Sequence, residues 1–297
     1  MSIDPLDRDY NPRLGVPDVA GLFARWQESA ADARAKLRCD LDLQYGPSPA
    51  QTFDFFAAPG SNSPLLIFIH GGYWRALDKK DFSWVAPGYV AAGIAVAVLN
   101  YGLLPSTSLP EIVAQMRRAC MWIYSHAAEL GVDPTRILCS GHSAGGHLAA
   151  MMLTSDWPQA GTAGLPRRLL AGAVSVSGLF DLEPLSRAPF LHDDLRLDDG
   201  LVRQMSPIHQ PWRNDVPLLR AVGALETAAF HRQSELIANY WPQACPTPVM
   251  DLSGCDHFTA CDALATPGTP LFSAVRELSG APVVCDASVP VERPAAV

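Results

Sequence analysis

The stretch RILCSGHSAGGHLAAMML, residues 136–153, decides the fold of this chain. Its first residues form an apolar run typical of a strand buried on both faces, and its last residues follow an apolar helix pattern. Between them, GHSAG (141–145) matches the G-x-S-x-G pattern of a nucleophile elbow, in which a sharp turn lifts the serine hydroxyl above the sheet. A chance turn rich in Gly and Ser would match the letters without needing a strand before it and a helix after it. We therefore expect Ser143 to be a nucleophile.

Apolar runs of strand length alternate with helical patterns on either side of this motif. The runs most typical of parallel strands lie at residues 64–70, 93–101, 136–141, 171–178, 217–223 and 248–254. Residues 51–57 alternate between polar and apolar types and indicate an antiparallel edge strand, whereas residues 17–38 and 109–129 carry apolar residues at helical spacing. The alternation predicts an α/β fold with a mostly parallel central sheet and helices on both faces.

We expect the 297 residues to form a single domain, because no linker interrupts this alternation. Residues 1–50 are expected to form an N-terminal helical extension. Residues 183–215 are rich in Pro, Asp and His and show little periodicity, and a segment of this length inside a compact domain is usually functional, so a lid over the site is expected here. Residues 281–297 carry several Pro and Ala and are expected to form a loosely packed tail.

Composition argues against several classes of protein. The 22 basic and 30 acidic side chains give a formal net charge of −8, which argues against a nucleic-acid binder. Neither a signal-peptide pattern nor an apolar run of membrane-spanning length occurs, and the seven cysteines are scattered without a CxxC pair. We therefore expect a cytoplasmic protein with free thiols and no metal site, acting on a small molecule without membrane contact. No P-loop or dinucleotide-binding glycine pattern occurs, so no cofactor is expected. The oligomeric state stays open.

A second glycine-rich motif, HGGY (70–73), follows an apolar strand. In α/β-hydrolases the loop at this place donates a backbone N–H to the oxyanion of the tetrahedral intermediate, and glycines allow the main chain to approach the substrate closely. A tight turn explains one glycine more easily than two beside a histidine. We expect the oxyanion hole to consist of the N–H groups of Ala144 and of Gly71 or Gly72.

A serine nucleophile needs a histidine base and an orienting carboxylate, in the chain order serine, acid, histidine. His257 follows the last predicted strand, where its side chain would reach the carboxyl edge of the sheet, so it is the expected base. His231 lies in a helical stretch and His209 in the expected lid, and both are weaker candidates. His142 adjoins the serine but, as its neighbour in the elbow, is expected to point away from the hydroxyl.

Glu226 is the expected acid, because it follows the predicted strand at 217–223 and precedes His257. Asp181, after the preceding strand, is its rival. Asp251 and Asp256 are weaker because they lie inside or just after the last strand. The alternative role for Glu226 is that of a neighbour to the N-cap of the helix that follows.

Six stretches carry a family resemblance. They are HGGYW (70–74), GHSAGGHLAA (141–150), GALETAAFHRQS (223–234), DHF (256–258), YNPRLGVPDV (10–19) and SGLFDLEPL (177–185). Together they resemble the arylformamidase, or kynurenine formamidase-like, branch of the α/β-hydrolase superfamily, in order over residues 10–265. HGGYW is fairly specific to this branch, whereas GHSAGG is shared with hormone-sensitive-lipase-like esterases, whose loop more often reads HGGG.

The resemblance implies an α/β-hydrolase fold and a serine hydrolase. It implies roles for Ser143 as nucleophile, His257 as base, Glu226 as acid, and Gly71, Gly72 and Ala144 as oxyanion hole, and it places Tyr73 and Trp74 beside the substrate pocket. Better-known arylformamidases carry aspartate where this chain has Glu226. Bacterial members of the branch also include esterases of other small compounds, so the branch by itself does not define the substrate.

The expected activity is hydrolysis of a small-molecule carboxylic ester through an acyl-enzyme intermediate. The alternative is hydrolysis of N-formyl aryl amines such as N-formylkynurenine, because both substrates pass through the same tetrahedral intermediate. An alternative of another class is a catalytically silent ligand-binding protein of the same fold. Such a protein would be expected to lack the serine, the histidine or the acid, and all three candidates are present here.

Overall fold

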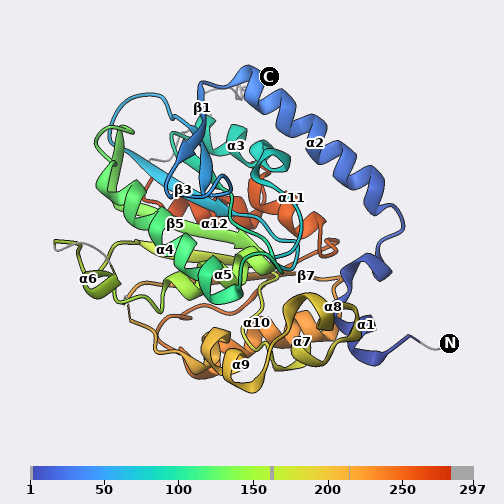
Figure 1. The fold of residues 1–297 in the computed structure, drawn as a ribbon. Helices are drawn as coiled ribbons and strands as arrows, with labels where there is room; N and C mark the ends of the chain where they lie inside the picture. The colour runs from blue at the N-terminus through green and yellow to red at the C-terminus, as the bar shows by residue number, and fades with distance from the viewer. Residues whose placement is uncertain (1–2, 161–163, 214, 282–297) are drawn as a thin grey trace, which may run out of the picture.

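One mixed sheet organises residues 3–160, 164–213 and 215–281, which are the residues described by this computed structural model (Figure 1). Within them, eight strands lie in the order β1-β2-β4-β3-β5-β6-β7-β8. The strands are β1 (Cys39–Gln44), β2 (Thr52–Phe56), β3 (Ser63–Ile69), β4 (Ala95–Leu99), β5 (Val132–His142), β6 (Gly172–Val176), β7 (Leu218–Gly223) and β8 (Met250–Leu252). β2 runs antiparallel to β1 and β4, and the other neighbours are parallel. The prediction of a mostly parallel sheet is confirmed.

The central strands bury side chains on both faces. In β3, Leu65, Ile67 and Ile69 belong to one hydrophobic core, and Leu66 and Phe68 belong to the other. All five side chains are fully buried. Parallel strands covered on both faces need such continuous apolar runs, which is why the runs in the sequence mark the strands.

Helices cover both faces of the sheet (Figure 1). One core is packed by α4 (Leu109–Ser125), α5 (Ala144–Met152) and α10 (Ala228–Tyr240), and the other by α2 (Val19–Lys36), α3 (Ala86–Ala91), α11 (Thr259–Ala265) and α12 (Pro270–Leu278). The shorter helices in the first 160 residues are α1 (Pro5–Tyr10), η1 (Pro12–Gly15), η2 (Lys79–Asp81), η3 (Ser83–Val85) and α6 (Trp157–Ala160). The helices predicted at 17–38 and 109–129 correspond to α2 and α4.

The strand expected at the edge of the sheet lies one position inside it. β1 pairs with β2, with Cys39 opposite Phe56, so β2 has a neighbour on each side. The sequence of β1, CDLDLQ, carries two aspartates, and most of its side chains are exposed. Hydrophobic patterning therefore does not reveal β1, because an edge strand tolerates charge and needs little apolar burial.

The N-terminal extension connects the two helical layers. Tyr10, the last residue of α1, packs against Phe230 of α10, with ring centroids 5.9 Å apart. Trp26 of α2 lies in the other core, where its Nε1 donates a hydrogen bond to Asp262 Oδ1 at 2.6 Å. Residues 11–25 therefore cross from one face of the sheet to the other.

Residues 183–215 contain short helices where an aperiodic loop was expected. They form α7 (Glu183–Arg187), α8 (Pro189–Leu195), α9 (Asp199–Met205) and η4 (Pro207–His209). The three α-helices have five to seven residues each, too few for a helical period to be recognised in a sequence. That this segment acts as a lid stays a prediction. Of the expected tail at 281–297, residues 282–297 lie outside the described residues.

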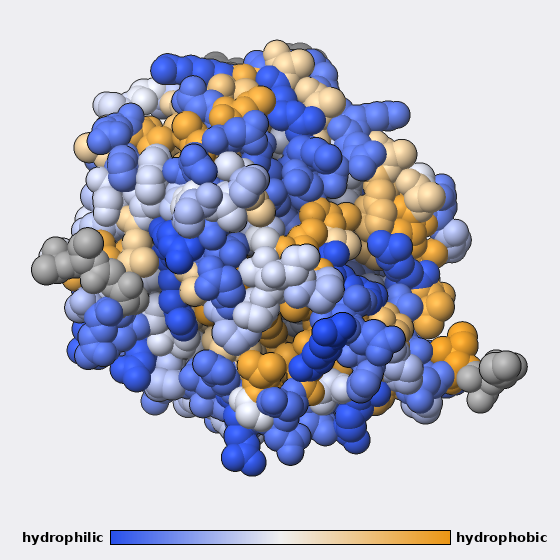
Figure 2. Space-filling view, viewed as in Figure 1, coloured by the Kyte–Doolittle hydropathy of each residue, from blue (hydrophilic) through white to orange (hydrophobic). Residues whose placement is uncertain are grey.

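On the face shown in Figure 2, hydrophobic residues reach the surface in patches separated by hydrophilic ones. The large hydrophobic side chains that are exposed in the described part of the chain are Ile3, Leu14, Leu41, Leu225 and Tyr240. No helix in the described ranges has the length and apolar character needed to cross a membrane.

Candidate active site

Ser143 lies on the turn between β5 and α5, with backbone angles φ 56° and ψ −119°. This conformation is strained for a residue with a side chain, and the hydrogen bond from Ser143 N to Val176 O at 2.8 Å helps to hold it. The flanking glycines have no room for larger residues. A Cβ on Gly141 would lie 2.2 Å from Gly145 O, and one on Gly145 would lie 1.9 Å from Ile69 O. The elbow expected from the sequence is present, with Ser143 at its apex.

The loop after β3 lies against this elbow. A Cβ on Gly71 would lie 2.9 Å from the carbonyl oxygen of His142 and 3.2 Å from Ser143 Cβ. Gly72 has φ +98° and lines the same pocket as Ser143. Ala144 is the first residue of α5, where backbone N–H groups have no partner within the helix. Among the described residues, the amides of Gly71, Gly72 and Ala144 donate no hydrogen bond to the protein, so they are available to an oxyanion.

His70 supports the glycine loop after β3 from the protein interior. Its ring is fully buried between Phe82 and Tyr101, at centroid distances of 5.7 and 4.4 Å. Its Nδ1 donates a hydrogen bond to Gly71 O at 2.9 Å. Burial lowers the pKa of His70, which favours the neutral ring. His70 therefore supports the glycine loop and does not line the pocket.

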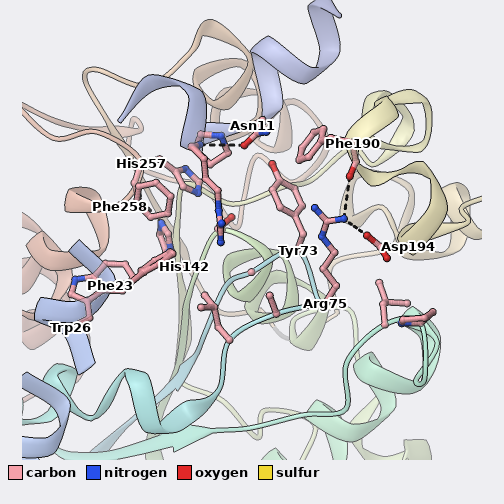
Figure 3. Close-up of a pocket in the computed structure, with 18 residues that line it drawn as sticks. Asn11, Phe23, Trp26, Tyr73, Arg75, His142, Phe190, Asp194, His257 and Phe258 are labelled. Atoms are coloured by element: carbon pink, nitrogen blue, oxygen red, sulfur yellow. Dashed lines mark hydrogen bonds and ion pairs between the residues drawn. The ribbon is translucent and has the colours of Figure 1, made fainter. Parts of the chain in front are cut away.

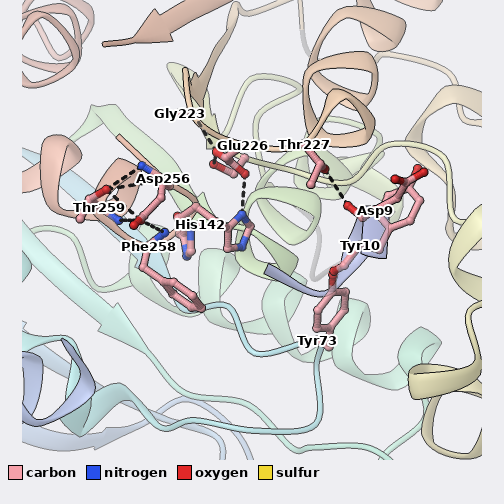
Figure 4. Close-up of polar contacts among 12 residues, drawn as sticks. Asp9, Tyr10, Tyr73, His142, Gly223, Glu226, Thr227, Asp256, Phe258 and Thr259 are labelled. Carbon is pink, nitrogen blue, oxygen red and sulfur yellow. Dashed lines mark hydrogen bonds and ion pairs between the residues drawn. The ribbon is translucent and has the colours of Figure 1, made fainter. Parts of the chain in front are cut away.

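His257 and Glu226 are brought together at the carboxyl edge of the sheet. Glu226 follows β7 and His257 follows β8, and these strands are parallel neighbours. His257 Nδ1 donates a hydrogen bond to Glu226 Oε2 at 2.6 Å, and only 5% and 1% of the two side chains are exposed. Figure 4 shows Glu226 beside Gly223, from whose N–H it also accepts a hydrogen bond. Because the Nδ1 proton is engaged, Nε2 is the nitrogen of the neutral ring that accepts a proton.

Glu226 is held in its ionised form by its partners. Burial would raise the pKa of Glu226, but the positive charge of His257 and hydrogen bonds from His257, Ser177 Oγ and Gly223 N together lower it. Ser177 and Gly223 both donate to Oε1, at 2.5 and 2.7 Å, and this leaves Oε2 for His257. Sequence analysis missed Ser177, because a serine after a buried strand carries no distinctive signal.

The rival residues are occupied elsewhere. Asp181 Oδ1 accepts a hydrogen bond from the backbone at the start of α7, and Asp256 Oδ1 accepts two from the backbone at the start of α11. Asp251 is exposed on β8. His209, in η4, and His231, in α10, do not line the pocket that contains Ser143.

The elbow opens into a pocket of about 500 Å³ (Figure 3). Of the residues expected at the site, Ser143, His257, Gly72 and Tyr73 line it. Figure 3 shows His257 on one side of the pocket and Tyr73 on the other. The remaining lining residues are Asn11, Pro12, Arg13, Phe23, Trp26, Arg75, Ala76, Leu77, Leu104, Pro105, His142, Phe190, Asp194 and Phe258.

The N-terminal extension supplies one wall that sequence analysis missed. Asn11, Arg13, Phe23 and Trp26 all line the pocket, and the Arg13 guanidinium lies 5.5 Å from the centroid of the Phe23 ring. The YNPRL stretch (10–14) marks this segment as part of the family resemblance. Nothing local in it indicates that the chain passes the pocket, since that depends on where α1 and α2 pack.

Arg75 connects the glycine loop to α8 through contacts with Phe190 and Asp194. It donates a hydrogen bond to Phe190 O at 3.0 Å, forms an ion pair with Asp194, and places its guanidinium 5.8 Å from the Phe190 ring centroid. Tyr73 meets the same ring edge to face at 5.5 Å, and its hydroxyl donates to the backbone carbonyl of Tyr10. From the expected lid, Phe190 and Asp194 are the residues that line the pocket.

Trp74 corrects one expectation, because it does not line the pocket. Its side chain is fully buried in the core, where the ring meets His147 of α5 edge to face at 5.0 Å. Tyr73 and Trp74 are neighbours in a turn with φ 50° and 56°, and only Tyr73 reaches the pocket. The large apolar area of the indole favours burial under α5 over exposure in the pocket wall.

Trp74→Ala is therefore expected to act on stability, lowering the free energy of unfolding by about 3–5 kcal/mol, as cavity-forming substitutions of buried tryptophan do. Urea unfolding measures this loss. Trp74→Phe serves as the control and should lose less, because the indole N–H has no hydrogen-bond partner among the described residues. A loss in the free energy of unfolding below about 1 kcal/mol, together with a changed preference between substrates, would show that Trp74 acts as a pocket residue.

His142 lines the pocket beside Ser143, and its ring contacts the main chain of His257. Its Nε2 lies 2.7 Å from the carbonyl oxygen of His257, and the two ring centroids are 4.7 Å apart. Burial, with a smaller effect from the charge of His257, lowers the pKa of His142 to about 3. The contact joins residues 115 positions apart, so no local pattern predicts it.

In the part of the chain that the structure describes, no group of three or more His, Cys, Asp or Glu is placed to hold a metal.

Comparisons with known proteins agree with this architecture. Residues 54–169 match the BD-FAE family. The chain is 30% identical over 282 residues to a kynurenine formamidase of Danio rerio, covering 89% of this chain and 92% of that protein. It is 32% identical over 148 residues to Esterase LipQ of Mycobacterium tuberculosis, covering 48% of this chain and 33% of that protein. A solved structure of a proposed thioesterase from Silicibacter sp. TM1040 has a TM-score of 0.81 and 32% identity, covering 92% of this chain and 99% of that one.

The similarity to the Danio rerio protein extends over nearly the whole of both chains, and it includes the elbow and the strands that carry Glu226 and His257. The fold, with its mostly parallel sheet and serine elbow, is that of an α/β-hydrolase. The relatives are hydrolytic enzymes. The chain belongs to the kynurenine formamidase family of α/β-hydrolases and is a hydrolytic enzyme.

Proposed function

We propose that Ser143, His257 and Glu226 are the catalytic triad of a serine hydrolase that cleaves a small carboxylic ester through an acyl-enzyme. The observation that carries the proposal is the buried 2.6 Å contact between His257 Nδ1 and Glu226 Oε2, beside a pocket that Ser143 and His257 line together. A carboxylate on Nδ1 fixes the ring in the tautomer whose Nε2 accepts the serine proton, and it stabilises the imidazolium that results.

In the first half of the proposed reaction, Ser143 Oγ attacks the carbonyl carbon while His257 Nε2 takes the hydroxyl proton. The carbonyl oxygen becomes an oxyanion, which the N–H groups of Ala144 and of Gly71 or Gly72 stabilise. His257 then gives its proton to the leaving oxygen, and the acyl group remains on Ser143. In the second half, water attacks the acyl-enzyme with His257 again as base, and the acid product leaves.

The pocket supports a small substrate. Its volume of about 500 Å³ and its aromatic wall suit a compact acyl or aryl group, in the range usual for small-molecule sites. We propose a reducing compartment such as the cytoplasm. The free thiols of the described cysteines, Cys39, Cys120, Cys139, Cys245, Cys255 and Cys261, are consistent with it.

Hydrolysis of N-formyl aryl amines is the second candidate. The extent of similarity favours it, because the Danio rerio kynurenine formamidase matches 89% of this chain, whereas Esterase LipQ matches 48%. The triad chemistry is the same for both, except that His257 would protonate an amine nitrogen in place of an alcohol oxygen. An amine is the poorer leaving group, so a formamide hydrolase depends more strongly on that proton transfer.

A matched substrate pair decides between the candidates. Phenyl formate and formanilide carry the same acyl and aryl groups and differ in the leaving atom alone. We expect a higher kcat/KM for phenyl formate, with N-formylkynurenine tested alongside. A formamide preference of tenfold or more, about 1.4 kcal/mol in the transition state, would make the second candidate the function. Turnover of neither compound, together with no fluorophosphonate labelling of Ser143, would contradict the serine hydrolase itself.

A further inference from the structure

The strands that carry Ser143 and His257 are not neighbours in the sheet. Ser143 follows β5 and His257 follows β8, and β6 and β7 lie between them. At about 4.8 Å per strand, the sheet holds the ends of β5 and β8 roughly 14 Å apart. The loop between β8 and α11 must therefore reach back over the sheet to bring His257 to the elbow. β8 has only three residues, so the strand itself gives this loop little support.

Two hydrogen bonds restrain His257, one at each end of the residue. Glu226 accepts from the side chain at Nδ1, at 2.6 Å. At the other end, His142 Nε2 lies 2.7 Å from the main-chain carbonyl oxygen of His257. Among the described residues, no backbone N–H donates to this carbonyl, since the amides that follow in α11 bond to Asp256 and Phe258 instead. His142 is therefore the partner that satisfies it.

The chemistry of this contact fixes the tautomer of His142. A carbonyl oxygen only accepts hydrogen bonds, so Nε2 of His142 must carry the proton. Burial lowers the pKa of the His142 ring to about 3. Its Nδ1 is therefore unprotonated, and the ring is neutral over the pH range in which a hydrolase works. A neutral donor at this place holds the carbonyl without placing a fixed positive charge beside the base.

We propose that His142 is a positioning residue that ties the main chain of His257 to the nucleophile elbow. His142 precedes Ser143 in the chain, so one covalent link and one hydrogen bond connect the nucleophile to the base across two intervening strands. This inference rests on the proposed triad and goes beyond it, because it makes a residue outside the triad responsible for the distance between nucleophile and base.

Three substitutions of His142 distinguish the effect of losing its hydrogen-bond donor from the effect of losing its ring. In His142→Gln the amide nitrogen occupies about the place of Nε2, in His142→Asn it occupies about the place of Nδ1, and His142→Leu has no donor. We expect His142→Leu to lower kcat by about a hundredfold, the cost of misplacing a catalytic group by about 1 Å. KM should change by less than about threefold, because leucine keeps a side chain of similar size at this place in the pocket wall. His142→Gln should recover most of the lost kcat, and His142→Asn should not.

His147→Leu is the matched control. His147 is also a buried histidine of low pKa, about 4, and its Nε2 donates to a backbone carbonyl at 2.7 Å, but the acceptor is Met205. Losing this donor should lower the melting temperature without the loss of kcat expected for His142→Leu. Fluorophosphonate labelling of Ser143 in the wild type tests the triad separately, so failure of that proposal is distinguishable from failure of this one.

Several results would overturn the proposal. Wild-type kcat in all three His142 variants would show that the hydrogen bond from His142 to the His257 carbonyl has no role in catalysis. Equal losses in His142→Gln and His142→Asn would assign the effect to the ring itself, and recovery by His142→Asn alone would assign it to Nδ1. Nitrogen-15 NMR of the wild-type protein gives a test that needs no variant to fold: a protonated Nε2 on His142 is expected, and an unprotonated Nε2 contradicts the hydrogen bond.

Discussion

Ser143→Ala is expected to lower kcat by about a thousandfold or more, because the variant keeps the pocket and the oxyanion donors but has no oxygen to form the acyl-enzyme. The loss corresponds to about 4 kcal/mol of transition-state stabilisation. The elbow makes this substitution mild for the fold, since the left-handed backbone of Ser143 is set by its neighbours and alanine adds no atoms. Turnover of phenyl formate at saturating substrate measures the effect, and circular dichroism confirms that the variant folds.

The control for this experiment is Ser186→Ala. Ser186 lies in α7, its Oγ donates a hydrogen bond to the backbone carbonyl of Glu183, and it does not line the pocket. Its removal should leave kcat within about twofold of the wild type, as for surface substitutions away from a site. A fluorophosphonate adduct found by mass spectrometry on any residue other than Ser143, or a Ser143→Ala variant with a tenth of wild-type activity, would show that the nucleophile is misassigned.

Glu226→Gln is expected to lower kcat by about 10³- to 10⁴-fold, as loss of the correct tautomer does in a triad. Ser177 and Gly223 both donate hydrogen bonds to Oε1, so the oxygen of the new amide must occupy that place. The amide nitrogen then faces His257 Nδ1 and donates to it. Nδ1 becomes the acceptor and Nε2 carries the proton, which leaves His257 unable to take the proton of Ser143.

Asp181→Asn is the matched control, because Asp181 is the rival acid and lies after the neighbouring strand β6. Its carboxylate accepts from the backbone N–H of Glu183 at 3.0 Å and does not contact His257. We expect its kcat to stay within about twofold of the wild type. If Asp181→Asn abolishes turnover while Glu226→Gln is nearly silent, the orienting acid has been misassigned.

The residues of the elbow and of the sheet edge could be predicted because their placement follows from short-range rules. A strand, five residues of turn and a helix define the elbow within one continuous stretch, 136–153. Glu226 and His257 follow apolar strands, and parallel strands bring their carboxyl ends to the same edge, so position after a predicted strand, together with chain order, favours them over the other acids and histidines. The contact between Glu226 and His257 follows from the arrangement of these strands, which the apolar runs in the sequence predict.

The pocket walls could not be predicted in this way, because they depend on how distant segments pack. Trp74 follows Tyr73 in the chain, but only the space under α5 decides that the indole is buried while the phenol reaches the pocket. Asn11 and Arg13 line the pocket because α1 and α2 are anchored on opposite faces of the sheet. Sequence patterning carries no information on where such anchors meet.

The sequence by itself determined which predicted strands precede the proposed catalytic residues, the turn that carries Ser143, and the resemblance to the family, since each depends on local runs of residues. Only the tertiary structure decided what surrounds them: the edge position of β1, the burial of Trp74, and the bond from His142 to the main chain of His257. The physical reason is that periodicity and turn geometry act over a few residues, whereas a hydrogen bond between residues 115 positions apart exists only after the whole sheet has assembled.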